Sequence, residues 1–151
     1  MKLSSKAVER IVLIIAILMI SFIVFTDRYS GYRDYSMGDS KGIHVIATAN
    51  SPESHARGLM QRREPLPDAS GMLFIYDPPR ETSMWMKNTY IPLDVLYLNS
   101  SRRVVHIARN MVPHSLEGHP STVPVSYAIE INGGESNRLG IKPGTTIEFL
   151  T

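Results

Sequence analysis

Residues 93–108 read LDVLYLNSSRRVVHIA and contain two apolar runs separated by a short polar segment. The runs, 93–98 and 103–108, are rich in β-branched and aromatic side chains, which favour extended strands. Residues 99–102 between them are small or polar, as turn-forming residues usually are. The stretch therefore predicts a β-hairpin, and its two largely apolar faces are typical of a strand pair inside a sheet.

Strand-like segments recur along the chain from residue 43 onward. They are short, apolar and bounded by turn-forming residues, and they cover 43–47, 72–76, 82–87, 125–131 and 145–150. Ser51-Pro52-Glu53 predicts the start of a short helix, because Ser caps a helix, Pro fits its first turn and Glu favours its positive end. Residues 111–123 contain two prolines and a glycine and are predicted to form a loop. We expect a mainly β fold, a compact sandwich or barrel with one or two short helices.

The first quarter of the chain has a different character. Residues 11–26, IVLIIAILMISFIVFT, are sixteen uncharged residues that follow basic ones. This pattern predicts a transmembrane helix with the N-terminus in the cytoplasm. The residues after it fit a cleavage site poorly, so we expect 1–26 to be an uncleaved signal anchor, 27–41 a polar linker and 42–151 an extracytoplasmic β-rich domain. The alternatives are a cleaved signal that releases a secreted domain, and a buried helix of a soluble protein.

The charge of the chain is concentrated in the predicted anchor. Residues 1–26 carry three basic residues and one acidic residue, which accounts for the whole formal net charge of +2. The rest of the chain is neutral and has no basic cluster, so the sequence predicts no nucleic-acid partner. The absence of cysteine excludes disulfides, zinc–thiolate sites and a cysteine nucleophile.

Asp94 is the one charged residue of the first hairpin strand. A turn centred on residues 100–101 would pair Leu96 with Val105. It would also place Asp94 opposite Ile107, on an apolar face, where an unpaired carboxylate is costly. We interpret Asp94 as an acceptor of backbone N–H bonds at the strand entrance. The alternative is a ligand-binding or acid/base carboxylate.

Trp85, Lys87 and Asn88 form the densest group of chemically distinctive side chains in the chain. In an extended strand, Trp85 and Lys87 would share one face, with Met84, Met86 and Asn88 on the other. A flat apolar ring beside hydrogen-bond donors is what sugar or peptide sites often need. This segment is therefore the candidate ligand-binding platform. The alternative is that Trp85 belongs to the core and Lys87 pairs with a carboxylate.

Glu130 is the only charged residue of the predicted strand 125–131. Alternation puts it on the face of Ser126 and Ala128, whose small side chains leave room for a cleft. We expect Glu130 to lie on a solvated face, and we keep it as an alternative candidate for acid/base chemistry.

His114 and His119 invite a metal interpretation, but their spacing matches no standard zinc pattern. The prolines and glycine around them exclude a regular helix. The chain also has no nucleophile elbow, phosphate-cradling glycine loop or dinucleotide fingerprint. We therefore expect no metal site and no cofactor.

Six motifs occur along the chain in a fixed order: Gly58-Leu59-Met60, Gly71-Met72-Leu73-Phe74, Trp85-Met86-Lys87-Asn88-Thr89, Ile91-Pro92-Leu93-Asp94, Ala128-Ile129-Glu130 and Gly140-Ile141-Lys142-Pro143-Gly144. In this order they resemble domain-of-unknown-function family 192, over residues 42–150. The resemblance implies a compact, mainly β, sandwich-like fold of bacterial and archaeal proteins that are often exported. It implies no activity, because that family has no established one. Ala128 is a departure, since the family usually has a larger aliphatic residue before the Glu.

Two functions remain open at this level. The first is a membrane-anchored binding or structural module at the cell envelope, which holds an envelope polymer, a peptide or a protein partner through Trp85, Lys87 and Asn88. The second is an acid/base hydrolase or lyase that uses Asp94 and Glu130 with Lys87 as the electrostatic partner. Such catalysis needs two groups in one pocket with pKa values pushed apart.

Overall fold

The computed structural model describes residue 19 and residues 40–151, and the latter belong to one compact unit, Asp39–Thr151. The predicted signal anchor, 1–26, and the predicted linker, 27–41, lie almost entirely outside the described residues. Within the described part of the chain, no helix has the length and apolar composition needed to cross a membrane.

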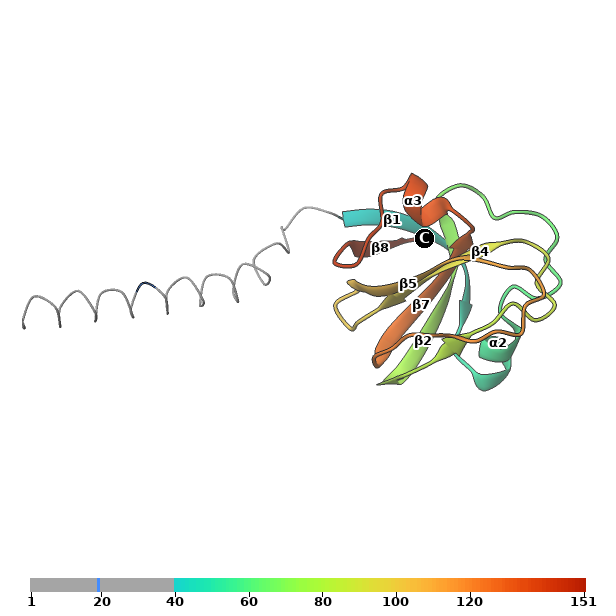
Figure 1. Cartoon of the computed structure of the whole chain (residues 1–151), viewed down its shortest axis with the longest axis horizontal. Helices are drawn as coiled ribbons and strands as arrows, with labels where there is room; N and C mark the ends of the chain where they lie inside the picture. The colour runs from blue at the N-terminus through green and yellow to red at the C-terminus, as the bar shows by residue number, and fades with distance from the viewer. Residues whose placement is uncertain (1–18, 20–39) are drawn as a thin grey trace, which may run out of the picture. The chain divides into compact units, whose positions relative to one another are not determined.

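The domain is mainly β, as the sequence predicts, and is built on one curled sheet with two short helices (Figure 1). The sheet has the strand order β5-β4-β7-β2-β1-β8, and β3 and β6 form a separate two-stranded sheet. The elements are β1 (Ser40–Ala49), α2 (Pro52–Arg57), β2 (Ser70–Arg80), β3 (Ser83–Met84), β4 (Leu93–Leu98), β5 (Val104–Met111), β6 (His119–Pro120), β7 (Val125–Asn132), α3 (Glu135–Arg138) and β8 (Thr146–Leu150). The architecture is thus a half-barrel rather than a sandwich of two comparable sheets.

The sheet curls because its two edge strands meet at one end. An isolated antiparallel bridge joins Arg103, just before β5, to Thr146 of β8. The Val104 amide donates to the Thr145 carbonyl at 2.9 Å, and the Ile147 amide donates to the Arg102 carbonyl at 2.9 Å. These bonds satisfy backbone groups that an open sheet would leave exposed at its edges.

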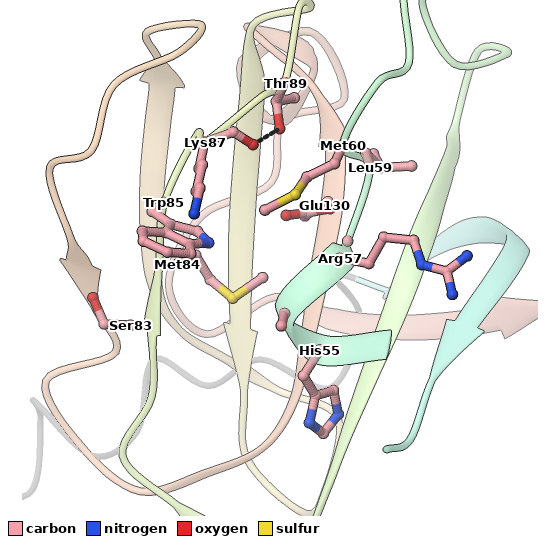
Figure 2. Close-up of a pocket in the computed structure, with 12 residues that line it drawn as sticks. His55, Arg57, Leu59, Met60, Ser83, Met84, Trp85, Lys87, Thr89 and Glu130 are labelled. Carbon is pink, nitrogen blue, oxygen red and sulfur yellow. Dashed lines mark hydrogen bonds between the residues drawn. The ribbon is translucent and has the colours of Figure 1, made fainter. Parts of the chain in front are cut away.

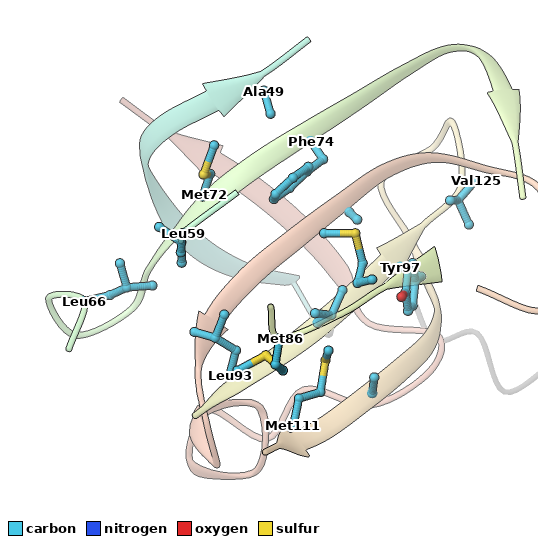
Figure 3. Packing of buried hydrophobic residues seen from close by; sticks show 14 of the residues in the cluster. Ala49, Leu59, Leu66, Met72, Phe74, Met86, Leu93, Tyr97, Met111 and Val125 are labelled. Carbon is cyan, nitrogen blue, oxygen red and sulfur yellow. The ribbon is translucent and has the colours of Figure 1, made fainter. Parts of the chain in front are cut away.

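Each face of the sheet has its own hydrophobic core. The aliphatic core holds Ile43, Leu73, Leu96, Leu98, Val104, Ile107, Ile129, Ile131, Ile141 and Ile147. The mixed core, shown in Figure 3, contains four methionines and three aromatic residues besides its aliphatic members, among them Met72, Met86, Met111, Phe74 and Tyr97. It also takes side chains from outside the sheet, from the turn after α2 and from the segment after β3. The mixed core is therefore the face on which loops are packed and a pocket is formed.

The predicted hairpin exists, but its predicted register was wrong. Leu96 pairs with Ile107 instead of Val105, and irregularities interrupt the ladder near both ends of β4. The turn is also wider than a two-residue turn, because the Asn99 amide pairs with the Arg103 carbonyl at 3.0 Å. As a result Val104 joins the aliphatic core, and Val105 packs against the mixed core.

The predicted helix start at Ser51 is confirmed. The Ser51 hydroxyl accepts the Ser54 amide at 3.2 Å in a capping box, and Pro52 begins the helix. Gly58 ends it with φ of 47°, a conformation that disfavours residues with a side chain. This turn places the following residues over the mixed core.

Candidate functional site

The two candidate carboxylates lie on neighbouring strands but on opposite faces of the sheet. In the β4–β7 ladder, Asp94 pairs with Ile131, and Val95 pairs with Glu130. Paired residues point to the same face and consecutive residues to opposite faces, so the two side chains point apart. The structure therefore does not bring Asp94 and Glu130 into one site.

Asp94 is fully buried and saturated with hydrogen bonds. Its Oδ1 accepts the Asn110 amide at 2.8 Å and the Gly134 amide at 3.0 Å. Its Oδ2 accepts the amide of Ser136 at 3.0 Å and the hydroxyl of the same residue at 2.5 Å. The interpretation of Asp94 as an acceptor of backbone N–H bonds is confirmed, because three of these four donors are main-chain amides. Asp94 ties the start of α3 to the hairpin.

Glu130 is also buried, with 4% of its surface exposed, so the expectation of a solvated face was wrong. The turn after α2 covers it: a Cβ built on Gly58 would lie 3.2 Å from Oε2. Within the described residues, Oε2 has no hydrogen-bond partner. Burial raises the pKa of Glu130 to about 8, and only a backbone hydrogen bond from Leu59 opposes this. Glu130 is therefore a neutral acid at pH 7 with unused hydrogen-bonding capacity.

Glu130 forms the floor of a small pocket on the mixed-core face (Figure 2). The cavity has a volume of about 40 Å³. Its apolar wall includes Leu59, Met60 and Met84, and Figure 2 shows both methionine side chains beside Glu130, whereas the Arg57 guanidinium points away from it. The pocket is thus a narrow apolar recess with one polar group at its base.

Trp85 and Lys87 stand at the mouth of this pocket. Trp85 is 42% exposed, and the Lys87 ammonium lies 5.2 Å from the centre of its ring. The strand predicted over 82–87 was too long, because β3 ends at Met84, but Met84 and Met86 are buried and Trp85 and Lys87 are exposed, as the predicted alternation requires. Asn88 departs from it, because it has a φ of 53° and is exposed. Its carbonyl accepts the Gln61 amide at 2.8 Å, so its main chain fixes the loop.

A second cavity of about 320 Å³ adjoins the first through His55, which lines both. His55 Nε2 lies 3.1 Å from the Ala49 carbonyl, and Nδ1 lies 3.2 Å from a nitrogen of Arg80. The Arg80 guanidinium in turn lies 5.0 Å from the centre of the Tyr76 ring. The His55 ring is therefore held in place between the two cavities.

Sequence reasoning missed the residues that α2 and its turn contribute. His55, Gly58 and Met60 lie at least 70 positions before Glu130, and no local pattern links them to it. The signal in the sequence is the motif Gly58-Leu59-Met60, which belongs to the resemblance and by itself indicates no contact with Glu130.

The pocket suits hydrogen bonding better than paired acid/base chemistry. Glu130 is its only carboxyl group among the described lining residues, and Thr89 and Ser83 add hydroxyls. The Thr89 hydroxyl already donates to the Lys87 carbonyl at 3.3 Å. No three His, Cys, Asp or Glu side chains gather as metal ligands within the described ranges.

The family model DUF192, described as Uncharacterized ACR, matches residues 36–149, so the chain belongs to this family. Two solved structures are similar to the chain. A protein of unknown function from Novosphingobium aromaticivorans DSM 12444 is 44% identical with a TM-score of 0.63, and the match covers 66% of this chain and 71% of that one. A proposed transcription regulator from Sinorhizobium meliloti 1021 is 44% identical with a TM-score of 0.62, and the match covers 64% of this chain and 74% of that one. No curated protein matches the chain.

Proposed function

We propose that this DUF192 domain is a non-catalytic binding module that works at the cell envelope. In this proposal residues 1–26 anchor it in a membrane, with the domain on the outer side. The pocket between Trp85 and Glu130 takes a protruding group of an envelope polymer or peptide. The anchor rests on the apolar run 11–26 and on the basic residues that precede it.

The unpartnered Oε2 of Glu130 is the observation that carries this proposal. A buried polar atom without a partner costs about 1–3 kcal/mol. Glu135 Oε2 is also buried without a partner within the described residues, but Glu135 Oε1 accepts from the Ala69 amide and from Arg138, and Glu135 does not line the pocket. Because Glu130 lines an open pocket, a ligand group that enters beside its carboxyl group can supply the missing hydrogen bond.

The two adjoining cavities favour an extended ligand. A recess of about 40 Å³ holds only a few atoms, but a cavity of about 320 Å³ shares His55 as a lining residue with it. Trp85 adds an exposed flat surface at the mouth of the first. A chain molecule could insert one substituent and lay its neighbouring units along this groove.

The hydrolase or lyase alternative loses its geometric basis. It requires two carboxylates in one pocket, and Asp94 faces the opposite side of the sheet from Glu130. Asp94 is also fully engaged by the start of α3 and by Asn110. Within the described lining, Glu130 is the only carboxyl group, so the pair of carboxylates that this alternative needs is not present.

A titration of the full chain with a soluble digest of bacterial envelope glycan and peptide tests the proposal. Trp85 is the only tryptophan, so its fluorescence reports on the pocket mouth alone. We expect a saturable change that Glu130→Met weakens by about tenfold, because the buried hydrogen bond is lost. The exposed Glu117→Gln is the matched control and should behave as the wild type. An unchanged Trp85 signal, together with no heat of binding in calorimetry, would refute the proposal.

A further inference from the structure

We propose that the group bound by this pocket is the acetamido substituent of an N-acetylated amino sugar, with the sugar ring stacked on Trp85. This inference rests on the proposed binding function and names the chemical class of its ligand. It combines three features of the site: the size of the recess, the buried carboxyl group of Glu130 that lines it and has an unpartnered oxygen, and the aromatic surface at its mouth.

The size of the recess admits a small substituent but excludes a sugar ring. A cavity of about 150 Å³ is needed to hold a benzene ring, so the recess of about 40 Å³ cannot hold a sugar ring. A planar group of a few heavy atoms is small enough. The ring that carries it must then remain at the mouth, where Trp85 is 42% exposed.

The walls of the recess match the two ends of an acetamido group. The methyl group would lie against Leu59, Met60 and Met84, which are apolar. At neutral pH Glu130 keeps its proton, because burial raises its pKa to about 8. Its carboxyl group can then donate an O–H to the acetyl carbonyl, and no charge has to be buried.

The charges around the recess disfavour a cationic ligand group, such as an ammonium group, in place of the neutral acetamido group. Lys87 lines the same pocket, and its positive charge would repel an ammonium group. The ionisable groups that interact with Glu130 are Tyr76 of β2 and Tyr97 of β4, and His55 and Lys87 also line the pocket, whereas the Arg57 guanidinium points away from Glu130. None of them is a second acid that could offset a bound cation.

The aromatic mouth favours a sugar over an acetylated peptide side chain. Pyranose rings present flat C–H surfaces to aromatic rings, whereas an acetyl-lysine reaches the recess through a flexible chain and needs no platform. A sugar ring would replace the Lys87 ammonium over the Trp85 ring, and that exposed contact is weak. The larger cavity beyond His55 can take the next sugar unit.

The test compares three β-1,4-linked tetramers by calorimetry: N-acetylglucosamine, glucosamine and glucose. The full chain is kept in a detergent without a sugar headgroup, and circular dichroism verifies that each variant is folded. We expect the acetylated tetramer to bind at least about tenfold more tightly than the other two, because only it fills the recess and meets the acid. Its Trp85 fluorescence change should saturate with the same affinity.

Two variants at Glu130 test the direction of the hydrogen bond. Glu130→Gln keeps an N–H donor of similar size, so it should bind the acetylated tetramer within about threefold of the wild type. Glu130→Met has no donor and should bind about tenfold more weakly. Wild-type binding should weaken above pH 8, as Glu130 loses its proton, and binding by Glu130→Gln should not.

Other outcomes would overturn the inference in distinguishable ways. Tighter binding of the glucosamine tetramer, abolished by Glu130→Gln, would make the pocket an ammonium site. If an N-acetyl-lysine peptide bound as tightly as the N-acetylglucosamine tetramer, the pocket would recognise an acetamido group without requiring a sugar ring. In both cases, or if only the envelope digest bound, the proposed binding function would stand. If neither the digest nor any tetramer bound, both proposals would fail.

Discussion

Asp94 and Glu130 are buried carboxylates on neighbouring strands of one sheet, and they differ in almost every other respect. Asp94 faces the aliphatic core and accepts four hydrogen bonds, three from main-chain amides. Glu130 faces the mixed core, has an unpaired oxygen and lies below an open recess. Burial alone is therefore a poor guide to function, because both side chains are at most 4% exposed.

The difference in hydrogen bonding between Asp94 and Glu130 indicates which of the two carboxyl groups stabilises the fold and which destabilises it. A saturated buried carboxylate fixes the fold, since its donors would otherwise lie unsatisfied. A buried carboxyl group with a free oxygen weakens the fold, and its persistence calls for another role. The two faces of the sheet thus separate a structural carboxylate from a candidate functional one, and substitutions can test that separation.

The largest effect is expected from Asp94→Ala. The substitution leaves three main-chain amides without an acceptor, one of them buried and two partly buried, and we expect a loss of about 5 kcal/mol in the free energy of unfolding. Urea unfolding of the full chain, followed by Trp85 fluorescence, measures this. Asp68→Ala is the control, because the Asp68 side chain is 90% exposed and lies 3.8 Å from Arg138. A loss as small as that of the control would show that Asp94 is not structural.

Glu130→Met, in contrast to Asp94→Ala, should not destabilise the domain at neutral pH. The difference in unfolding free energy between the wild type and this variant should depend on pH. Folded Glu130 keeps its proton up to about pH 8, whereas unfolded Glu130 loses it near the ordinary value of 4.5. The unfolded state therefore binds fewer protons between these values, and the wild type loses stability as pH rises through this window. Relative to the variant, we expect the wild type to lose about 2–3 kcal/mol between pH 5 and pH 7.

The measurement is the difference in unfolding free energy between wild type and Glu130→Met at several pH values, so that other titrating groups cancel. Glu117→Gln, at an exposed loop position, should give a difference that is flat with pH. A flat difference for Glu130→Met as well would mean that Glu130 ionises normally in the folded chain, and the contrast with Asp94 would disappear.

The sequence predicted the alternation that places Glu130 and Asp94, but not their surroundings. Period-2 patterning correctly put Glu130 with Ala128 and put Asp94 on the face of Leu96. Patterning does not reveal which distant segment covers a strand, so the turn at Gly58 and the burial of Glu130 were missed. The pairing error at Val105 arose from irregularities in the ladder, which depend on turn geometry rather than on composition.

Gly58→Ala probes how the turn after α2 approaches Glu130. Gly58 has a φ of 47°, and an added Cβ would lie 3.2 Å from Glu130 Oε2 and 3.4 Å from the Phe74 ring. We expect a loss of about 2 kcal/mol from backbone strain and crowding together. Gly140→Ala is the matched control, because Gly140 also has a positive φ, of 68°, but a Cβ there would meet nothing within 4 Å. It should cost only about 1 kcal/mol, and equal losses in the two variants would mean that the turn can move away from Glu130.

Lys87→Gln should have the smallest effect, because Lys87 belongs to the mouth of the pocket and not to either core. Its ammonium lies 5.2 Å from the centre of the Trp85 ring, and an exposed contact of this kind contributes about 0.5 kcal/mol. Lys142→Gln, at another exposed position, is the control in the same urea experiment. A loss above about 2 kcal/mol would mean that Lys87 supports the fold through Glu130. The mixed-core face would then hold a structural charge pair, and Glu130 would resemble Asp94 after all.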